Sequence, residues 1–352
     1  MDPAMAIDGK ATLGPPAPPP TVLVLGGTGF IGQALVRRLR RAGLGTRALV
    51  RAGSAKAALM AEQGVDLVVG DFSDAATLVT ALIGIDHVYH LARGSGSSWD
   101  DYLRNDVMPT RQLAELCAAR GAALYYTSSI AIYHGGREGD VIDEATPPSP
   151  DALRMNVYAR AKAENERVLA EMHRERGLKV VIFRPGIVIG AGGSPYHPGV
   201  GAWPSHTRCR PWGGGNQRLP FVLVDDCADA MVRASQIDGI AGESFNLIGD
   251  ASLSANGYLD ALQRATGATI RRASLPTGWL FARSIAKWAV LKLLGTRACE
   301  APTYRYFEGL ARQGSFSAER AKRRLGWSPT AEVAVLIENG ISVPGSPLGL
   351  AR

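Results

Sequence analysis

The sequence predicts an α/β protein, with a Rossmann-type, doubly wound parallel sheet and a smaller, discontinuous, mostly helical substrate lobe. Two observations lead to this prediction. Short apolar runs of strand length alternate with helical patterns over the first half of the chain, and a glycine-rich turn joins the first run to the first helix. Strands that are apolar throughout and separated by helices are typical of a parallel sheet covered on both faces. Right-handed crossovers then give the doubly wound arrangement.

The expected elements follow in order along the chain. We expect strands at residues 21–26, 46–50, 66–70, 87–92, 123–129 and 179–186. Helical patterns separate them at 31–43, 74–84, 110–121 and around Tyr158. We assign residues 21–190 with 219–249 to a dinucleotide-binding domain, and 191–218 with 250–340 to a substrate-binding lobe over the carboxyl ends of the strands, where open α/β sheets bind ligands. Residues 1–20 and 341–352 are expected to be a disordered and a flexible tail.

Composition excludes several classes of protein. The 352 residues carry a net charge of +7, but the basic clusters precede glycines that would end helices, so they complement helix dipoles and do not predict nucleic-acid binding. No apolar run reaches the roughly 18–20 residues of a membrane span. The four cysteines are scattered, which favours a reducing, cytoplasmic setting without a structural metal.

The glycine turn has the spacing of a phosphate-binding loop. In "VLGGTGFIG", Gly26 would make the tight turn, Gly29 would let the backbone approach a pyrophosphate, and Gly32 would allow close packing of helix on strand. The amino end of the following helix would offer N–H donors to the phosphates. The sequence therefore predicts a dinucleotide site.

The second and third strands bear on the choice of cofactor. An NAD site usually has an acidic residue at the end of the second strand, whereas this chain has Arg51 there. A guanidinium could clamp a 2′-phosphate, so we expect NADP(H), with NAD(H) as the alternative. Asp71 and Phe72 follow the third strand and are expected near the adenine; the alternative for Asp71 is a helix cap, for which Ser73 or Asp74 is the better candidate.

Seven motifs occur in the order found in one known family: "GGTGFIG", "GDFSD", "HLARG", "YTSSIAIYHG", "YARAK", "RPGIVIG" and "FVLVDDCADA". The chain resembles the extended short-chain dehydrogenase/reductase family, which includes nucleotide-sugar epimerases and dehydratases, 3β-hydroxysteroid dehydrogenases and dihydroflavonol reductases. The resemblance covers residues 21–250 and implies a homodimer.

The resemblance also implies the site residues. Tyr158 would be the general acid–base, and Lys162, one helical turn later, would lower its pKa and orient the nicotinamide ribose. Ser129 would hold the substrate oxygen, with Ser128 and Thr127 as alternatives. Further contacts to the cofactor would come from Thr28, Phe30, Ile31, Leu91, Ala92, Arg93, Pro185 and Gly186.

Two segments depart from patterns known in the family. Many relatives have Asn in an "NVxGT" segment where this chain has Asp106, in "NDVMPT". Sugar dehydratases of the family carry an Asp-Glu pair after the catalytic hydroxyl, but Ile130 and Ala131 stand here and cannot move protons. We therefore expect an NADP(H)-dependent oxidoreductase that interconverts a ketone and a secondary alcohol. The alternatives are a nucleotide-sugar epimerase with tightly bound NAD and a non-catalytic, dinucleotide-sensing regulator.

The sequence of the lobe does not identify the substrate. Arg208, Arg210 and Arg218, with Trp203 and Trp212, could hold a nucleotide diphosphate or be ordinary surface and core residues. At helical spacing, residues 278–295 gather Leu280, Phe281, Ile285, Trp288 and Leu291, with Arg283 and Lys287 on another side. This segment could cover an apolar substrate, contact a membrane surface, or pack on the core or a dimer partner.

Overall fold

The computed structural model describes residues 21–133, 139–151, 155–273, 276–295, 300–311 and 314–342. The tail expected at residues 1–20 lies outside the described residues, as does most of the one expected at 341–352. Ile341, the first residue of that second tail, is buried in the core and is 4% exposed.

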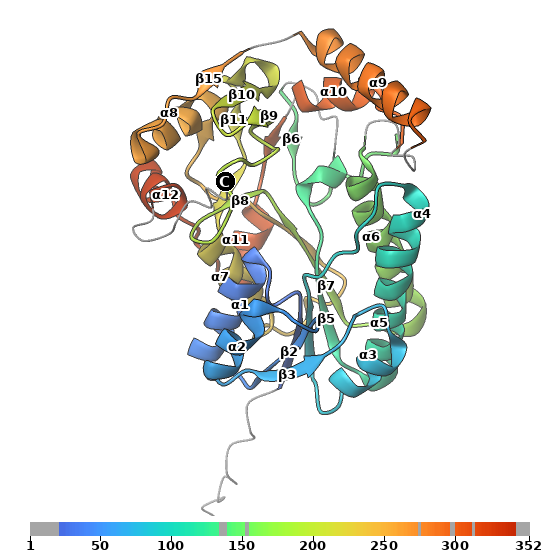
Figure 1. Ribbon diagram of the computed structural model, residues 1–352. Coiled ribbons are helices and arrows are strands. Elements are labelled where there is room, and N and C mark those ends of the chain that lie inside the picture. Colours follow the sequence, from blue (N-terminus) through green and yellow to red (C-terminus); the bar gives the residue numbers. More distant parts are fainter. Residues whose placement is uncertain are drawn as a thin grey trace, which may run out of the picture.

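A seven-stranded parallel sheet forms the centre of the molecule (Figure 1). Its strands, from one edge to the other, are β13 (Ser244–Leu247), β7 (Val180–Pro185), β5 (Ala123–Thr127), β4 (His87–His90), β1 (Val22–Leu25), β2 (Thr46–Val50) and β3 (Asp66–Val69). The order reverses between β1 and β4, so their carboxyl ends diverge into a crevice. The predicted doubly wound sheet is confirmed, and every expected strand is present.

Helices cover both faces of the sheet. One face carries α1 (Phe30–Arg41), α2 (Ala55–Glu62), α7 (Val224–Ala234) and α11 (Glu319–Leu325), and the other α3 (Ala75–Ala81), α4 (Trp99–Tyr102), α5 (Met108–Arg120) and α6 (Val157–Arg176). Leu35 and Met231 pack on the first face of β1, while Leu113 and Leu169 pack on the second. All four residues of β1 are fully buried, which explains its unbroken apolar run.

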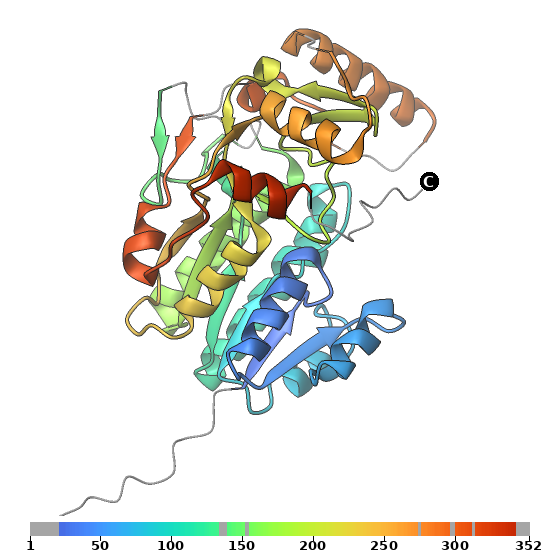
Figure 2. The same cartoon turned by 90° about the vertical axis from the view of Figure 1, so that its left-hand side faces the viewer.

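The lobe lies at the carboxyl end of the sheet in both views (Figure 1, Figure 2). Its helices are α8 (Ala255–Thr266), α9 (Thr277–Leu293), α10 (Tyr304–Ala311) and α12 (Val333–Gly340). It also contains small sheets that the sequence did not predict: β9 (Gly201–Ser205), β10 (Arg208–Pro211) and β15 (Arg271–Arg272) form one, and β11 (Arg218–Leu219) pairs with β14 (Leu253–Ser254).

Short segments join the two parts. β8 (Ile187–Ile189) continues from β7 and pairs with β12 (Phe221–Leu223), and β6 (Val141–Ile142) pairs with β16 (Ser315–Phe316). The described residues also include the short 3₁₀ helices η2 (Ile130–Tyr133) and η4 (Trp212–Gly215), and a π-helical turn, η1 (Leu103–Val107), between α4 and α5. Such π turns occur frequently at functional sites, and this one carries Asp106.

Candidate active site

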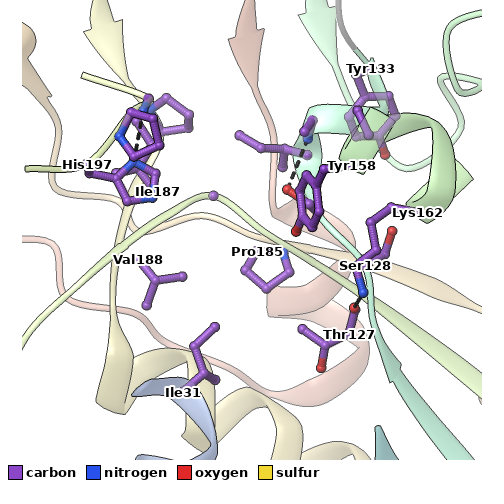
Figure 3. A pocket seen from close by; sticks show the side chains of 18 of the residues that line it. Ile31, Thr127, Ser128, Tyr133, Tyr158, Lys162, Pro185, Ile187, Val188 and His197 are labelled. Atoms are coloured by element: carbon purple, nitrogen blue, oxygen red, sulfur yellow. Dashed lines mark hydrogen bonds between the residues drawn. The ribbon is translucent and has the colours of Figure 1, made fainter. Parts of the chain in front are cut away.

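A cavity of about 790 Å³ opens between the carboxyl ends of the strands and the lobe. Figure 3 shows Thr127, Tyr158 and Lys162 facing Val188 and His197 across it. The predicted site residues that line it are Gly26, Gly29, Phe30, Ile31, Gly32, Leu91, Arg93, Ser129, Tyr158, Lys162, Pro185 and Gly186. The fold therefore gathers in one place residues that are far apart in the sequence.

The glycine turn has no room for side chains. Gly26 has φ 84°, and a Cβ there would lie 2.6 Å from the backbone nitrogen of Ala92. A Cβ on Gly32 would overlap the carbonyl oxygen of Gly26 and lie 2.8 Å from the Cα of Gly27. Gly29 is the N-cap of α1 and offers no side-chain cap, so the first N–H groups of the helix face outward. This cradle fits a pyrophosphate.

Polar atoms without partners also fit a dinucleotide. Among the described residues, the hydroxyls of Thr127 and Ser128 are buried and make no hydrogen bond. Both residues line the cavity, Thr127 as the last residue of β5 and Ser128 directly after it. Buried hydroxyls normally have a partner. A nicotinamide dinucleotide would be held by the turn at Gly26, Gly29 and Gly32 and by these hydroxyls.

Tyr158 enters the cavity from the first turn of α6. The side chain of Asn156 caps this helix by accepting a hydrogen bond from the backbone N–H of Ala159 over 2.8 Å. Burial raises the pKa of Tyr158 above its usual value. A hydrogen bond from the Ser129 side chain and the positive charge of Arg93 lower this pKa, but they do not offset the effect of burial.

The ammonium of Lys162 is held by two hydrogen bonds beside Tyr158. Its ammonium lies 6.0 Å from the centre of the Tyr158 ring and donates to the Tyr126 hydroxyl over 3.1 Å and to the Thr127 carbonyl over 2.9 Å. Arg93, whose guanidinium carbon lies 5.8 Å from the same ring, is the cation that lowers the pKa of Tyr158. Burial lowers the pKa of Lys162, while the charge of Asp106 raises it.

Asp106 forms the centre of a buried polar network that sequence reasoning left unresolved. It is 1% exposed and accepts from the Gly94 backbone N–H over 2.8 Å and from the Asn165 amide over 2.6 Å. The same amide nitrogen donates to the Tyr126 hydroxyl over 2.8 Å. This chain of contacts links the π turn to Lys162. The departure from Asn at position 106 was the only sequence signal for it.

The residues expected at the adenine end lie outside the cavity lining. Thr28, Arg51, Asp71, Phe72 and Ala92 are the predicted cofactor residues that do not line it. Asp71 accepts hydrogen bonds from the Ser73 backbone and hydroxyl, and Asp74 caps α3, as the alternative reasoning allowed. Arg51 is exposed at the end of β2. Their contacts with a cofactor remain predictions.

Sequence reasoning did not find the cavity wall that lies away from the glycine turn. Its lining comes from the lobe and neighbouring loops: Asn156, Tyr196, His197, Pro198, Tyr306, Leu310 and Phe316. Burial lowers the pKa of His197 to about 4, so the ring is neutral at pH 7, and its Nδ1 accepts from the Gly199 N–H. Arg208, Arg210 and Arg218 do not line this cavity. No local pattern marked these positions, because only the tertiary fold brings them to the cavity.

The sheet, glycine turn and tyrosine–lysine helix define an NAD(P)-dependent oxidoreductase of the extended short-chain dehydrogenase/reductase type. The chain belongs to the NAD-dependent epimerase/dehydratase family, which it matches over residues 22–247. The predicted family resemblance is thereby confirmed.

Several relatives match nearly the whole chain. A 2-alkyl-3-oxoalkanoate reductase of Stenotrophomonas maltophilia is 29% identical over 91% of this chain and 97% of its own. A 4-hydroxy-2-methyl-3-oxo-4-farnesyl-3,4-dihydroquinoline-1-oxide ketoreductase of Stigmatella aurantiaca is 26% identical over 87% of this chain and 91% of its own. The crystal structure of UDP-glucuronic acid 4-epimerase from Bacillus cereus, with UDP-glucuronic acid and NAD, superposes with a TM-score of 0.68 over 91% and 98% of the chains. Its identity is 21%, so it shows the shared fold alone.

Proposed function

We propose that the protein interconverts a ketone and a secondary alcohol with NADP(H). The observation that carries this proposal is that Ser129, Tyr158 and Lys162 line the same cavity as the glycine turn. A bound nicotinamide would supply or accept the hydride. Side chains of this protein would transfer the proton and hold the substrate oxygen.

The proton is assigned to Tyr158. Its raised pKa keeps the phenol protonated at neutral pH, so in reduction the hydroxyl can donate to the carbonyl oxygen of the substrate. Ser129 would hold that oxygen beside the phenol. Arg93 would stabilise the phenolate that forms, since its charge favours the ionised ring. Lys162, held by Tyr126 and Thr127, would point its remaining N–H toward the cofactor ribose.

The substrate is proposed to be a largely apolar ketone. A nucleotide diphosphate calls for cations, yet the charged residues of the described lining are Arg93 and Lys162, both close to Tyr158. At the far end the side chains are neutral or apolar, including Tyr306, Leu310 and Phe316. The names of the two relatives above, a 3-oxoalkanoate reductase and a ketoreductase, support a ketone as substrate.

We propose that the two parts of the chain bind different molecules, one the dinucleotide and the other the substrate, as expected from the sequence. Residues 21–190 and 219–249 would hold the dinucleotide, and residues 191–218 and 250–340 would hold the substrate. The lining supports this division, because the first set supplies the glycine turn and Tyr158, while the second supplies Tyr196, His197 and α10.

NADP(H) is proposed over NAD(H) because of Arg51. Its exposed guanidinium at the end of β2 is free to approach a 2′-phosphate. Arg51→Ala should weaken NADPH binding by about 10-fold or more and leave NADH binding nearly unchanged, since a charged hydrogen bond of about 1.5–3 kcal/mol is lost only with NADPH. Fluorescence titration with both cofactors measures this, and equal losses for both would contradict the proposal.

Tyr158→Phe tests the reaction itself. With NADPH and a panel of 3-oxo esters and cyclic ketones, its kcat should fall about 10²- to 10⁴-fold while NADPH binding persists. Tyr304→Phe, at a half-exposed position outside the cavity lining, is the control and should keep full activity. Unimpaired turnover by Tyr158→Phe would remove the mechanism. NAD released from denatured protein, together with interconversion of nucleotide sugars, would replace it with the epimerase.

A further inference from the structure

Helix α9 is a surface element without a buried residue, although it is 17 residues long. Large apolar side chains lie open on it and on the residue that follows: Trp279 is 70% exposed, Val290 54%, Leu293 88% and Leu294 72%. A helix on a water-facing surface normally turns polar side chains outward. On α9 the outward face instead carries large apolar side chains.

The two faces of α9 are distinct. Leu280, Phe281, Ile285, Trp288 and Leu291 are half-buried, as their spacing predicted. Within this face Phe281 packs on α10, with ring centres 5.8 Å from Tyr304 and 6.4 Å from Phe307. Trp279, Ala286, Val290 and Leu293 recur at helical spacing on the opposite face. In Figure 1 α9 lies outside α10, at the outer edge of the lobe.

The charge of this segment has one sign. Between residues 276 and 295 the chain contains Arg283, Lys287 and Lys292 but no Asp or Glu. Arg283 and Lys287 are exposed and flank the open apolar face, one helical turn apart. An apolar stripe that is bordered by cations, with no acidic residue in the same segment, complements a partner with an apolar interior and a negatively charged boundary.

We propose that the outer face of α9 docks on the surface of an anionic lipid bilayer. Trp279, Val290, Leu293 and Leu294 would enter the boundary between headgroups and acyl chains, and Arg283 and Lys287 would contact the phosphates. In the described ranges no helix is long and apolar enough to cross a membrane, so the helix would lie in the interface plane. A second copy of the chain fits less well, because it would bring the same unbalanced cations to the contact.

The position of α9 connects this surface to the cavity. Helix α10, on which α9 packs, contributes Tyr306, Gly309 and Leu310 to the cavity lining. Docking would set the substrate end of the cavity beside the bilayer, where an apolar ketone partitions. This last link rests on the proposed function, whereas binding to lipid does not.

Vesicle flotation with the full chain tests the docking surface. The protein should float with phosphatidylcholine vesicles that contain phosphatidylglycerol, and much less with phosphatidylcholine alone. The double variant Arg283→Gln/Lys287→Gln should lower partitioning onto the anionic vesicles by about 10-fold or more, and added salt should do the same. Trp279→Ala/Leu293→Asp should lower it on both kinds of vesicle.

Arg40→Gln/Arg41→Gln, which removes two exposed charges from the end of α1, is the matched control and should float like wild type. Circular dichroism checks that each variant is folded. The proposal would be overturned if the control and Arg283→Gln/Lys287→Gln lost vesicle binding equally, or if the wild-type protein did not float with anionic vesicles. So would sedimentation showing a dimer that Leu293→Asp dissociates, together with no lipid binding. Ketone reduction in the absence of vesicles is measured separately, so failure of docking and failure of the proposed activity are distinguished.

Discussion

Arg93 places its guanidinium carbon 5.8 Å from the centre of the Tyr158 ring, and its charge lowers the pKa of that phenol against the opposing effect of burial. The cation reaches Tyr158 from the loop after β4, whereas Lys162, on the same helix as Tyr158, is held by Tyr126 and Thr127. A residue that is distant in the sequence therefore contributes to the acidity of the phenol, whose pKa burial raises most strongly.

Arg93→Gln should raise the pKa of Tyr158. Ketone reduction uses the protonated phenol and is lost as pH rises through this pKa, so the alkaline limb of kcat/KM should move to higher pH. A pH profile of NADPH-dependent reduction measures the limb. Arg104→Gln, which removes an exposed cation paired with Asp101, should leave the profile in place. A limb that moves to lower pH in Arg93→Gln would refute the assignment.

Asp106→Asn should lower the pKa of Tyr158, the opposite of the effect expected for Arg93→Gln. The carboxylate raises the pKa of both Tyr158 and Lys162, so its removal lowers both. The alkaline limb of ketone reduction should then move to lower pH. Asn keeps a carbonyl oxygen for the Gly94 N–H, and circular dichroism checks that the variant is folded. An unchanged profile would mean that the buried charge at position 106 has only a structural role.

Gly32→Ala should damage both stability and cofactor binding. The new methyl group would collide with the backbone of Gly26 and Gly27, and relieving that overlap costs about 1–3 kcal/mol. Urea unfolding and NADPH titration should both show the loss. Gly45→Ala is the matched control, because its Cβ would meet only the Thr21 hydroxyl at 3.9 Å. If both variants bind NADPH like wild type, the cradle is not built as described.

Arg184→Met should destabilise the fold. Arg184 on β7 and Glu166 on α6 form a buried ion pair with an N–O distance of 2.6 Å, and the side chains are 7% and 5% exposed. Removal of one partner leaves a buried, unpaired carboxylate, at a cost of about 3–5 kcal/mol. Arg167→Met breaks two ion pairs on the exposed face of the same helix, with Glu164 and Glu171, each of which is worth about 0–1 kcal/mol. Similar urea midpoints for the two variants would contradict the expected difference.

The local sequence was sufficient to predict the sheet, the glycine turn and the helix that carries Tyr158 and Lys162. Apolar runs predict buried strands because both faces of a parallel strand are covered, and the Gly26–Gly29–Gly32 spacing follows from backbone contacts that exclude any Cβ. These features depend on neighbours along the chain or on packing that repeats in every protein of this fold. The family resemblance rests on the same residues.

Tertiary structure alone decided the electrostatics and the walls of the site. The approach of Arg93 to Tyr158 and the pairing of Asp106 with Asn165 depend on distances between segments that only folding brings together. His197 and Tyr306 carry no motif, since a cavity wall requires only shape and neutrality at a point in space. The open face of α9 likewise depends on tertiary structure, because α10 covers its other side and an apolar helix pattern does not tell which partner buries it.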